Sequence, residues 1–240
     1  ELLSHAYTIQ VELTRAKEMV PIANDNKNET IGIGVYASAI LVGVQDILGE
    51  FSKSNPGVKL RMHNLRKDLQ INLLRQGEIQ ILFDRYLTPE QDLACELVHR
   101  EYLSYVALHK KNPLARKKEI FIEDLVDAPR IGANHEIAMA AALSKITGSN
   151  APACHYVDDI LSAVTLVGAG LGITFVPPSV LNLKIPNVVY RPCLNHFNIP
   201  FDLQCMHRKK DNSPLLNSIL EKVREYRSLK ISTNEIGGQA

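Results

Sequence analysis

The chain lacks the marks of a membrane protein, a secreted disulfide protein or a zinc protein. Its 240 residues contain no apolar run near the roughly 18 residues of a membrane-spanning helix, and the N-terminus shows no signal-peptide pattern. The four cysteines (Cys95, Cys154, Cys193 and Cys205) form no CxxC pair, so neither a zinc site nor a disulfide framework is expected. For a chain that begins where the natural one does, these absences favour a cytoplasmic location and no membrane partner.

A surplus of charge is also missing. The 27 basic and 26 acidic side chains give a formal net charge of +1, whereas proteins that contact many phosphates of a nucleic acid usually carry a large basic excess. The basic cluster at residues 110–118 is interrupted by Pro113, which favours a solvated loop. Tight nucleic-acid binding by this chain alone is therefore not expected.

Sequence motifs of catalysis are absent as well. There is no GxSxG, HExxH or P-loop pattern, and the eight histidines lack the spacing of metal ligands. Cys205 and His207 share a face of an expected strand, where a coincidence of core and edge positions is favoured over a metal site. Asp158 and Asp159 are typical of a helix N-cap and first turn rather than of a general acid–base pair. The sequence predicts a protein without catalytic residues, bound metal or cofactor.

Two glycine patterns raise the question of a nucleotide site. In TLVGAGLGITFVPPS, residues 165–179, the glycines follow a helix and precede a strand, which places them at the wrong end of the helix dipole for phosphate. Gly32, Gly34 and Ala37 match GxGxxA, but the glycines lie inside the first strand and no acidic residue closes the second strand to bind a ribose. A helix C-cap with a tight turn is the expected structure at 168–172.

The sequence does contain a regular alternation of strand and helix patterns. Apolar residues repeat at steps of four and three over residues 1–20, a heptad seam that predicts a helix paired with a partner helix or packed on its own domain. After a polar linker, strand and helix patterns alternate, which predicts a parallel sheet with helices on its faces. This first series comprises a strand at 30–35, a helix with Ile40, Leu41, Val44, Ile47, Leu48 and Phe51 on one face, a strand at 58–62, a helix from Asp68 to Gly77 and a strand at 79–83.

A second series of strand and helix patterns follows. Its last strand leads into a helix with Pro214 in the first turn, and a tail from Ser232 is expected to be disordered. The series comprises strands at 102–109, 130–132, 153–157, 173–176, 188–192 and 203–207, and helices at 136–147 and 159–167.

The order of five motifs resembles a known family. IGIGVYAS, FSKSNPGVKL, LLRQGEIQILFDR, YLSYVALHKKNPLA and VGAGLGITFVPPS occur in this order within residues 1–226. Together they resemble the effector-binding portion of LysR-type transcriptional regulators, in a pattern most similar to regulators of aromatic-compound degradation. The resemblance implies an α/β fold like that of type 2 periplasmic binding proteins, with two Rossmann-like lobes, two chain crossovers and an N-terminal linker helix. The implied segments are a linker and dimerisation helix at 1–23, lobe I at 28–99 and 203–228, lobe II at 100–202, and a tail at 229–240.

The resemblance also implies a function. Members of this family bind a small effector in the cleft between the lobes, and the ligand favours one arrangement of the lobes. For this chain the implied effector is a carboxylated, anionic metabolite, and self-association to a dimer or tetramer is implied. DNA would be contacted only through an N-terminal domain outside this sequence, and RNA polymerase is a further implied partner. The alternatives are a solute-binding protein of a transport system, a two-lobed enzyme, and a peroxide sensor that uses Cys193 and Cys205.

Candidate ligand-binding residues in lobe I follow from these motifs. Ser38 and Ala39 lie in the turn after the first strand, where a hydroxyl and helix N–H groups suit a carboxylate, and a plain N-cap is the alternative for Ser38. Arg66 stands where aromatic-responsive relatives carry threonine, and it either binds an anion or forms its own salt bridge. Arg85, at the end of the third strand, either holds a ligand carboxylate or pairs with Asp84 or another acid.

Further candidates come from the second lobe. Ala133, Asn134 and His135 precede a helix and face the cleft by analogy with the family. Ile160 and Phe201 align with positions near the apolar wall of the pocket, although by themselves they indicate only a buried core.

Overall fold

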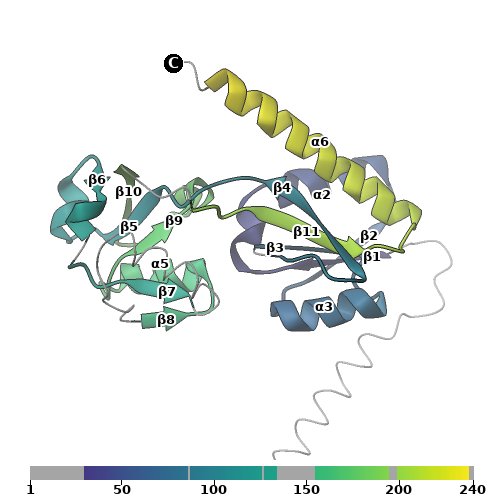
Figure 1. Cartoon of the computed structure of the whole chain (residues 1–240), viewed down its shortest axis with the longest axis horizontal. Coiled ribbons are helices and arrows are strands. Elements are labelled where there is room, and N and C mark those ends of the chain that lie inside the picture. The colour runs from purple at the N-terminus through teal and green to yellow at the C-terminus, as the bar shows by residue number, and fades with distance from the viewer. Residues whose placement is uncertain (1–29, 86, 126, 134–154, 195–198, 238–240) are drawn as a thin grey trace, which may run out of the picture.

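The computed structural model describes residues 30–85, 87–125, 127–133, 155–194 and 199–237. The heptad helix expected within residues 1–23 and the helix expected over 136–147 lie outside the described residues. Within the described part, the chain forms two main sheets, which lie in two separate halves of the molecule in Figure 1.

The first sheet consists of β1 (Thr30–Val35), β2 (Lys59–His63), β3 (Ile81–Arg85), β4 (Leu93–His99) and β11 (Leu203–Arg208). Its strand order is β2-β1-β3-β11-β4. Strands β2 and β3 both pair with β1 in parallel, with Ile33 opposite both Met62 and Ile81, so the predicted parallel sheet is confirmed. β11 runs antiparallel to β3 and to β4, and β4 is a strand that the sequence pattern did not reveal.

Helices cover both faces of this sheet: α2 (Val44–Ser54), α3 (Lys67–Gln76) and α6 (Pro214–Gly237). Successive side chains of a strand point to opposite faces. Ile81 and Phe83 accordingly belong to the core formed with α2 and α6, whereas Leu82 belongs to the core formed with α3. Figure 1 shows α2 and α6 above the sheet and α3 below it. Because α6 continues to Gly237, the prediction of a disordered tail is wrong as far as that residue.

The helix expected after β1 is broken into two parts. A short 3-10 helix, η1 (Ala37–Leu41), follows the strand, and α2 begins only after Gly43, whose φ of 75° lies in the left-handed region. A Cβ at Gly43 would lie 2.8 Å from the ring of Tyr226 in α6. Ile40 is 48% exposed instead of lying on one continuous apolar face, so this part of the prediction is wrong.

The two glycines of β1 allow close packing. A Cβ at Gly32 would lie 2.0 Å from the carbonyl oxygen of Glu78, and a Cβ at Gly34 would lie 2.2 Å from Oε1 of Gln70. Gln70 is fully buried on α3, and its amide nitrogen donates a hydrogen bond to the carbonyl oxygen of Val35 at 3.2 Å. The two glycines of the GxGxxA match therefore have a packing role inside the strand.

The second sheet consists of β5 (Tyr105–His109), β6 (Ile120–Phe121), β9 (Thr174–Val176) and β10 (Val188–Leu194), in the order β6-β10-β5-β9. A separate parallel pair is formed by β7 (Ile131–Ala133) and β8 (His155–Val157). A bridge between Arg130 and Ile173 joins this pair to the segment before β9. Helix α5 (Ile160–Gly168) buries Val164 and Val167 in the core of this half.

The glycine turn after α5 is a helix C-cap. The N–H of Gly170 donates to the carbonyl oxygen of Val167 at 2.9 Å, and the N–H of Leu171 donates to that of Leu166 at 3.2 Å. This pair of bonds is the Schellman motif, which requires a left-handed residue such as Gly170, with a φ of 81°. The predicted cap and turn are confirmed.

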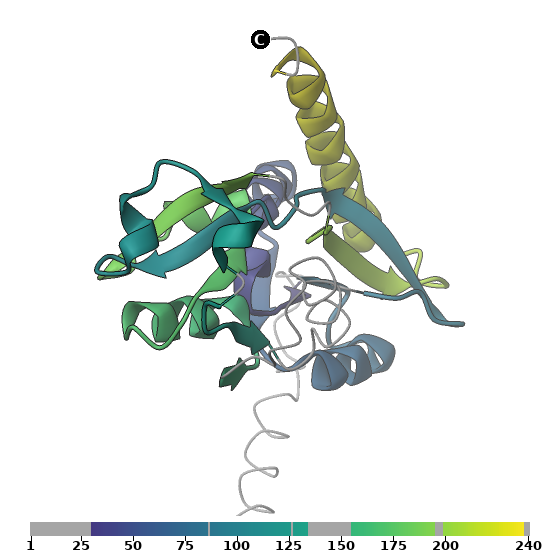
Figure 2. The ribbon, with the colours of Figure 1, turned by 60° about the vertical axis from the view of Figure 1, so that its left-hand side comes forward.

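Two extended segments cross between the halves, one after β4 and one before β11. They pair with each other, because the N–H of Leu103 donates to the carbonyl oxygen of Ile199 (3.1 Å) and the N–H of Phe201 donates to that of Glu101 (2.7 Å). We call the half built on the first sheet lobe I and the other half lobe II (Figures 1 and 2). The predicted two-lobed α/β fold with two crossovers is confirmed.

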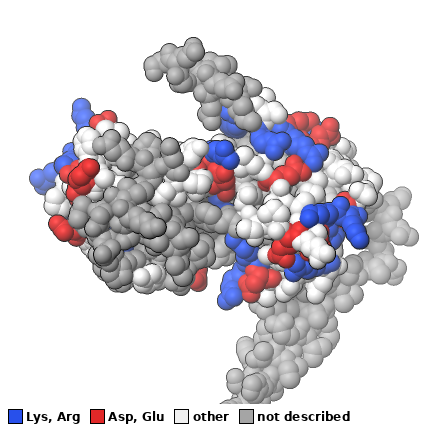
Figure 3. All heavy atoms as spheres, viewed as in Figure 1, with Lys and Arg blue, Asp and Glu red and all other residues white. Residues whose placement is uncertain are grey.

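The described surface carries charges of both signs. Figure 3 shows acidic and basic side chains interspersed over the described part of one face, in agreement with the nearly balanced composition. Among the described helices, none is both long enough and apolar enough to cross a membrane.

Candidate functional site

The carboxyl ends of the parallel strands of lobe I meet at one edge of the sheet. Tyr36 follows β1, Arg66 closes the turn after β2, and Arg85 ends β3. Ligands of open α/β sheets bind outside this edge. η1 at the same edge contacts α5 of lobe II, so the edge lies beside the other lobe.

Tyr36 lies within the electrostatic influence of carboxylates from both lobes. The pKa of its hydroxyl is raised first by burial and then by Asp159, Asp158 and Asp84. Asp84 belongs to lobe I, whereas Asp158 and Asp159 belong to lobe II. The region between the strand ends is therefore polar, partly buried and shared by both lobes.

Ser38 and Ala39 lie in η1 and are almost fully buried, with 3% and 0% of their surface exposed. The N–H of Ala39 donates to the carbonyl oxygen of Tyr36 at 3.0 Å. The turn itself therefore occupies one of the N–H groups that the sequence assigns to a ligand carboxylate. η1 has only five residues, so it offers little of the dipole that a longer helix would supply.

Arg66 is the N-cap residue of α3 and forms its own salt bridge. Its Nε and Nη2 lie 3.3 and 3.2 Å from the two carboxylate oxygens of Asp68. The hydrogen bond from Arg66 is the main cause that holds the pKa of Asp68 below its usual value. Both side chains are exposed, 75% and 60%, so the pair is open to competition from another anion.

A buried carboxylate that sequence reasoning did not assign to the site lies beside these residues. Oδ1 of Asp84 accepts a hydrogen bond from the N–H of Arg85 at 2.6 Å, and its Oδ2 lies 3.8 Å from Nζ of Lys67. Lys67 also donates to the carbonyl oxygen of Arg85 at 2.9 Å. The available signal was an acidic residue in a strand with an otherwise apolar pattern, because a buried charge requires a partner.

Replacing Asp84 by asparagine is expected to stabilise the protein at neutral pH. Burial raises the pKa of Asp84 to about 6, above the unfolded value of about 3.9, so the folded state binds this proton more tightly. The resulting stabilisation is fully present below about pH 4 and is lost as the pH rises through about 6. Asp84→Asn is therefore expected to increase the free energy of unfolding by about 1–3 kcal/mol at pH 7.5 and to change it little at pH 4.

Urea unfolding at the two pH values checks this expectation. Asp92→Asn is a suitable control, because Asp92 is exposed and the hydrogen bond from Arg75 lowers its pKa, so its loss should slightly destabilise the protein at neutral pH. A less stable Asp84→Asn variant at pH 7.5 would show that the pair with Lys67 outweighs the cost of burying the carboxylate.

Arg85 faces the crossovers rather than open space. Its Nη2 lies 2.7 Å from Oε1 of Glu101, and both side chains are 4% exposed. Its Cζ lies 4.4 Å from the ring centroid of Phe201, and the guanidinium donates to the carbonyl oxygen of that residue. Of the two alternatives for Arg85, the structure contains the pairing with an acid, which is Glu101 rather than Asp84. Phe201, assigned by the resemblance to the pocket wall, packs against this ion pair.

The first turn of α5 borders the shared region from lobe II. Oδ1 of Asp159 accepts hydrogen bonds from the N–H groups of Leu161 and Ser162 at 2.7 and 3.0 Å. The predicted N-cap is confirmed as Asp159, but the predicted first-turn acid is wrong, because Asp158 precedes the cap. The cap occupies two of the N–H groups that this helix would offer to an anion.

The other lobe II candidates lie nearby or outside the described residues. Ile160 is 6% exposed and belongs to the lobe II core, against which Leu41 of η1 also packs. Ala133 is the last residue of β7. Asn134 and His135 lie outside the described residues, so their predicted ligand contacts stay predictions.

Two cysteines singled out by the sequence are buried thiols. Cys193 and Cys205 are 1% and 0% exposed, and burial raises the pKa of Cys193 to about 11 and that of Cys205 to about 12. Because the thiolate is the reactive species, these values disfavour the peroxide-sensor alternative.

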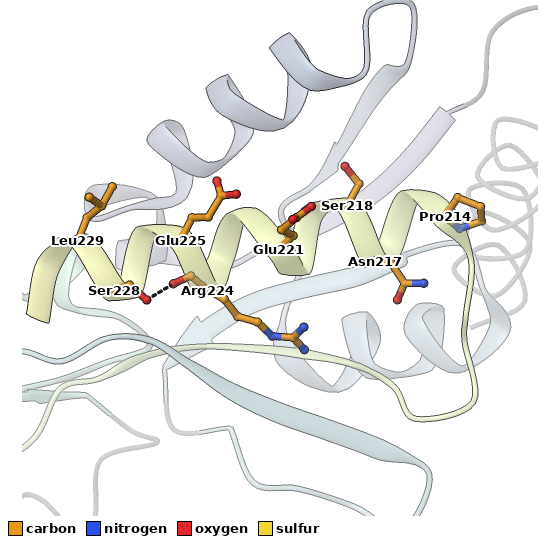
Figure 4. A pocket seen from close by; sticks show the side chains of 8 residues that line it. All are labelled: Pro214, Asn217, Ser218, Glu221, Arg224, Glu225, Ser228 and Leu229. Carbon is orange, nitrogen blue, oxygen red and sulfur yellow. Dashed lines mark hydrogen bonds between the residues drawn. The ribbon is translucent and has the colours of Figure 1, made fainter.

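An open groove that sequence reasoning missed lies along α6. Its volume is about 960 Å³, and its lining side chains all come from this helix, between Pro214 and Leu229 (Figure 4). Ligand sites usually enclose most of a small molecule, which the face of one helix does not do. The strand-end edge is therefore the better candidate.

Comparison with known proteins decides the family. Residues 24–228 match the family model described as LysR substrate binding domain. The chain belongs to this family. It is 31% identical over 165 residues to the HTH-type transcriptional regulator TfdS of Cupriavidus pinatubonensis, covering 66% of this chain and 55% of that protein. It is 25% identical over 224 residues to the HTH-type transcriptional regulator AlsR of Bacillus subtilis, covering 91% and 73%.

Solved structures share the fold of this LysR substrate-binding domain. The BenM effector binding domain with its effector benzoate has a TM-score of 0.69 at 22% identity, covering 84% of this chain and 93% of that chain. Full-length CbnR complexed with its target DNA has a TM-score of 0.72 at 21% identity, covering 94% and 78%. At these identities the likeness supports the fold alone.

The family match also bears on the alternatives. The relatives are transcription regulators rather than enzymes, as the sequence predicts, and a solute-binding protein of a transport system is not favoured. The chain spans 55% of the length of TfdS.

Proposed function

We propose that this LysR substrate-binding domain senses a small carboxylated metabolite between its lobes and that the ligand controls transcription by the whole protein. The observation that carries the proposal is the exposed Arg66–Asp68 pair at the N-terminus of α3. This pair lies at the edge of the sheet where ligands of such folds bind. In the proposed site, Ser38, Ala39 and Ala133 border the same space.

Asp68 holds the place that a ligand carboxylate would take. It accepts hydrogen bonds from Arg66 in the first turn of α3, where the helix dipole favours negative charge. Arg66 offers a planar, bidentate donor to a competing carboxylate. Arg85 is already paired with buried Glu101, so the recognition of an anion rests on Arg66.

Asp158 limits the charge that the ligand can carry. The pKa of Arg66 is raised mainly by its hydrogen bond to Asp68 and further by Asp158, which also raises that of Tyr36 after the effects of burial and Asp159. A second ligand carboxylate in this space would meet like charge from Asp158 and Asp84. We therefore propose a monocarboxylate with an uncharged body rather than a dicarboxylate.

Thermal unfolding with benzoate, muconate and benzamide tests this proposal. A ligand at about 100 times its Kd adds about 2.7 kcal/mol of stability. Benzoate is expected to raise the melting temperature, muconate less so, and the uncharged benzamide not at all. Arg66→Ala is expected to abolish the response to benzoate. Asp68→Asn is expected to increase it, because the internal competitor loses its charge.

Arg75→Ala is the matched control. Arg75 lies on the same helix and is held by exposed carboxylates, Glu90 and Asp92, so the response to benzoate should persist. If benzoate raised the melting temperature of Arg66→Ala as much as that of the parent, the anion would bind elsewhere. Equal rises with benzoate and benzamide would show that the ligand needs no carboxylate. No response to benzoate would count against an aromatic monocarboxylate as the ligand.

We further propose that the whole protein acts in the cytoplasm as a dimer or tetramer. In this proposal it binds DNA through a helix-turn-helix domain outside this chain and works with RNA polymerase. The support is that TfdS and AlsR are named HTH-type regulators and that CbnR has been solved with its target DNA. Electrophoretic mobility shift with promoter DNA is expected to show binding by the full-length gene product. Tight binding by this chain alone would contradict the proposal.

A further inference from the structure

One buried carboxylate contacts both lobes. Glu101 lies on the first crossover and is 5% exposed. Its Oε1 lies 2.7 Å from Nη2 of Arg85, at the end of β3 in lobe I. Its two oxygens also accept hydrogen bonds from Ser179, from the hydroxyl at 2.8 Å and from the N–H at 3.2 Å. Ser179 belongs to η5 (Pro178–Asn182) in lobe II.

The second crossover closes around this carboxylate. The ring of Phe201 packs on the guanidinium of Arg85. The backbone N–H of Phe201 donates to the backbone carbonyl oxygen of Glu101 at 2.7 Å. We call Arg85, Glu101, Ser179 and Phe201 the hinge cluster. All four residues are less than a tenth exposed, and they come from lobe I, lobe II and both crossovers.

The hinge cluster is sensitive to the angle between the lobes. Segments that cross between two lobes absorb the motion when the lobes rotate. A rotation about these crossovers changes the distance between Arg85 and Ser179, and one carboxylate can hold both only over a narrow range of that distance. A buried charged group that loses a partner is costly, so the arrangement with both contacts is favoured.

We propose that Glu101 is a latch that holds the two lobes in the described arrangement, with Arg85 as its partner in lobe I and Ser179 as its partner in lobe II. Removal of the Ser179 hydroxyl is expected to loosen the angle between the lobes while each lobe stays folded. The latch goes beyond the proposed ligand and does not depend on it.

A lobe-to-lobe distance measured without ligand tests the latch. Spin labels are placed at Ser52→Cys in α2 and at Lys184→Cys in lobe II, both exposed positions, in a chain whose Cys95 and Cys154 are replaced by serine. The remaining cysteines, Cys193 and Cys205, are buried. Pulsed electron paramagnetic resonance is expected to give one narrow distance distribution for the parent. For Ser179→Ala it should give a broader distribution with a second maximum.

Ser162→Ala is the matched control. Its hydroxyl donates to Oδ2 of Asp159 at 2.8 Å, a serine–carboxylate bond that lies within lobe II, so the distribution should stay narrow. Glu101→Gln, where it folds, is expected to broaden the distribution as Ser179→Ala does. An unchanged distance in Ser179→Ala would overturn the latch even if its melting temperature fell, and equal broadening in Ser162→Ala would overturn it as well.

Discussion

Replacing Glu101 by glutamine is expected to lower the free energy of unfolding by about 3–5 kcal/mol, the usual cost of removing one partner from a buried ion pair. The guanidinium of Arg85 is 4% exposed and lies under the ring of Phe201, so water cannot replace the lost carboxylate. Glutamine has one acceptor oxygen where glutamate has two, so one of the two hydrogen bonds from Ser179 is lost as well. The loss of stability therefore reports on the charge together with that bond. Urea unfolding at pH 7 measures the difference.

Two further variants make this result specific. Glu96 pairs with Arg224 at 2.7 Å, but these side chains are 20% and 55% exposed, so Glu96→Gln is expected to cost about 1 kcal/mol, less than Glu101→Gln. Replacing Arg85 and Glu101 together by apolar residues is expected to cost less than Glu101→Gln, because neither charge of this pair is then left buried without its partner. If Glu101→Gln and Glu96→Gln lowered the free energy of unfolding equally, the result would contradict a large cost for breaking the buried pair of Arg85 and Glu101.

Replacing Gly32 by alanine is expected to destabilise the fold by about 3 kcal/mol, at the upper end of the usual cost of overpacking. The new Cβ would lie 2.0 Å from the carbonyl oxygen of Glu78, a backbone atom that cannot rotate away. The strand is also held in place there, because the N–H of Gln80 donates to the carbonyl oxygen of Gly32 at 2.8 Å. This clash can be relieved only if α3 and the turn that follows it move away from β1.

Gly49 provides the control with the same substitution. It lies within α2, and a Cβ there would meet nothing within 4 Å. Gly49→Ala is expected to stabilise the protein by about 0.5–1 kcal/mol, because alanine favours the helix. Thermal or urea unfolding of both variants should therefore give changes of opposite sign. A neutral Gly32→Ala would mean that β1 and the turn at Glu78 separate easily.

Features decided by residues close together in the chain were predictable. Alternating apolar residues and intervening helices indicated that β1, β2 and β3 run parallel in one sheet. α3 ends at Gly77 in a left-handed conformation, with a φ of 85°, and the turn after α5 and the cap at Asp159 are equally local. In each case the conformation depends on a few neighbouring backbone groups that need hydrogen bonds.

Features that depend on distant segments were not predictable. The helix breaks at Gly43, whose left-handed backbone packs closely against Tyr226 of α6, and β4 pairs with β11, which comes from the far end of the chain. Tyr226 and β11 both lie far from these residues in the sequence, so the apolar pattern around them does not indicate either contact. Periodicity alone therefore favoured one continuous helix in the first case and did not indicate a strand in the second.

The candidate site also has one part that the sequence predicts and one part that depends on distant segments. The sequence by itself determined that Arg66 and Arg85 follow or end strands whose carboxyl ends share one edge. Only the tertiary structure decided that Arg66 lies exposed beside Asp68, while Arg85 is buried against Glu101 and Phe201. The reason is physical: an arginine binds whichever carboxylate the fold brings close to it, and for Arg85 that carboxylate comes from the crossovers between the lobes.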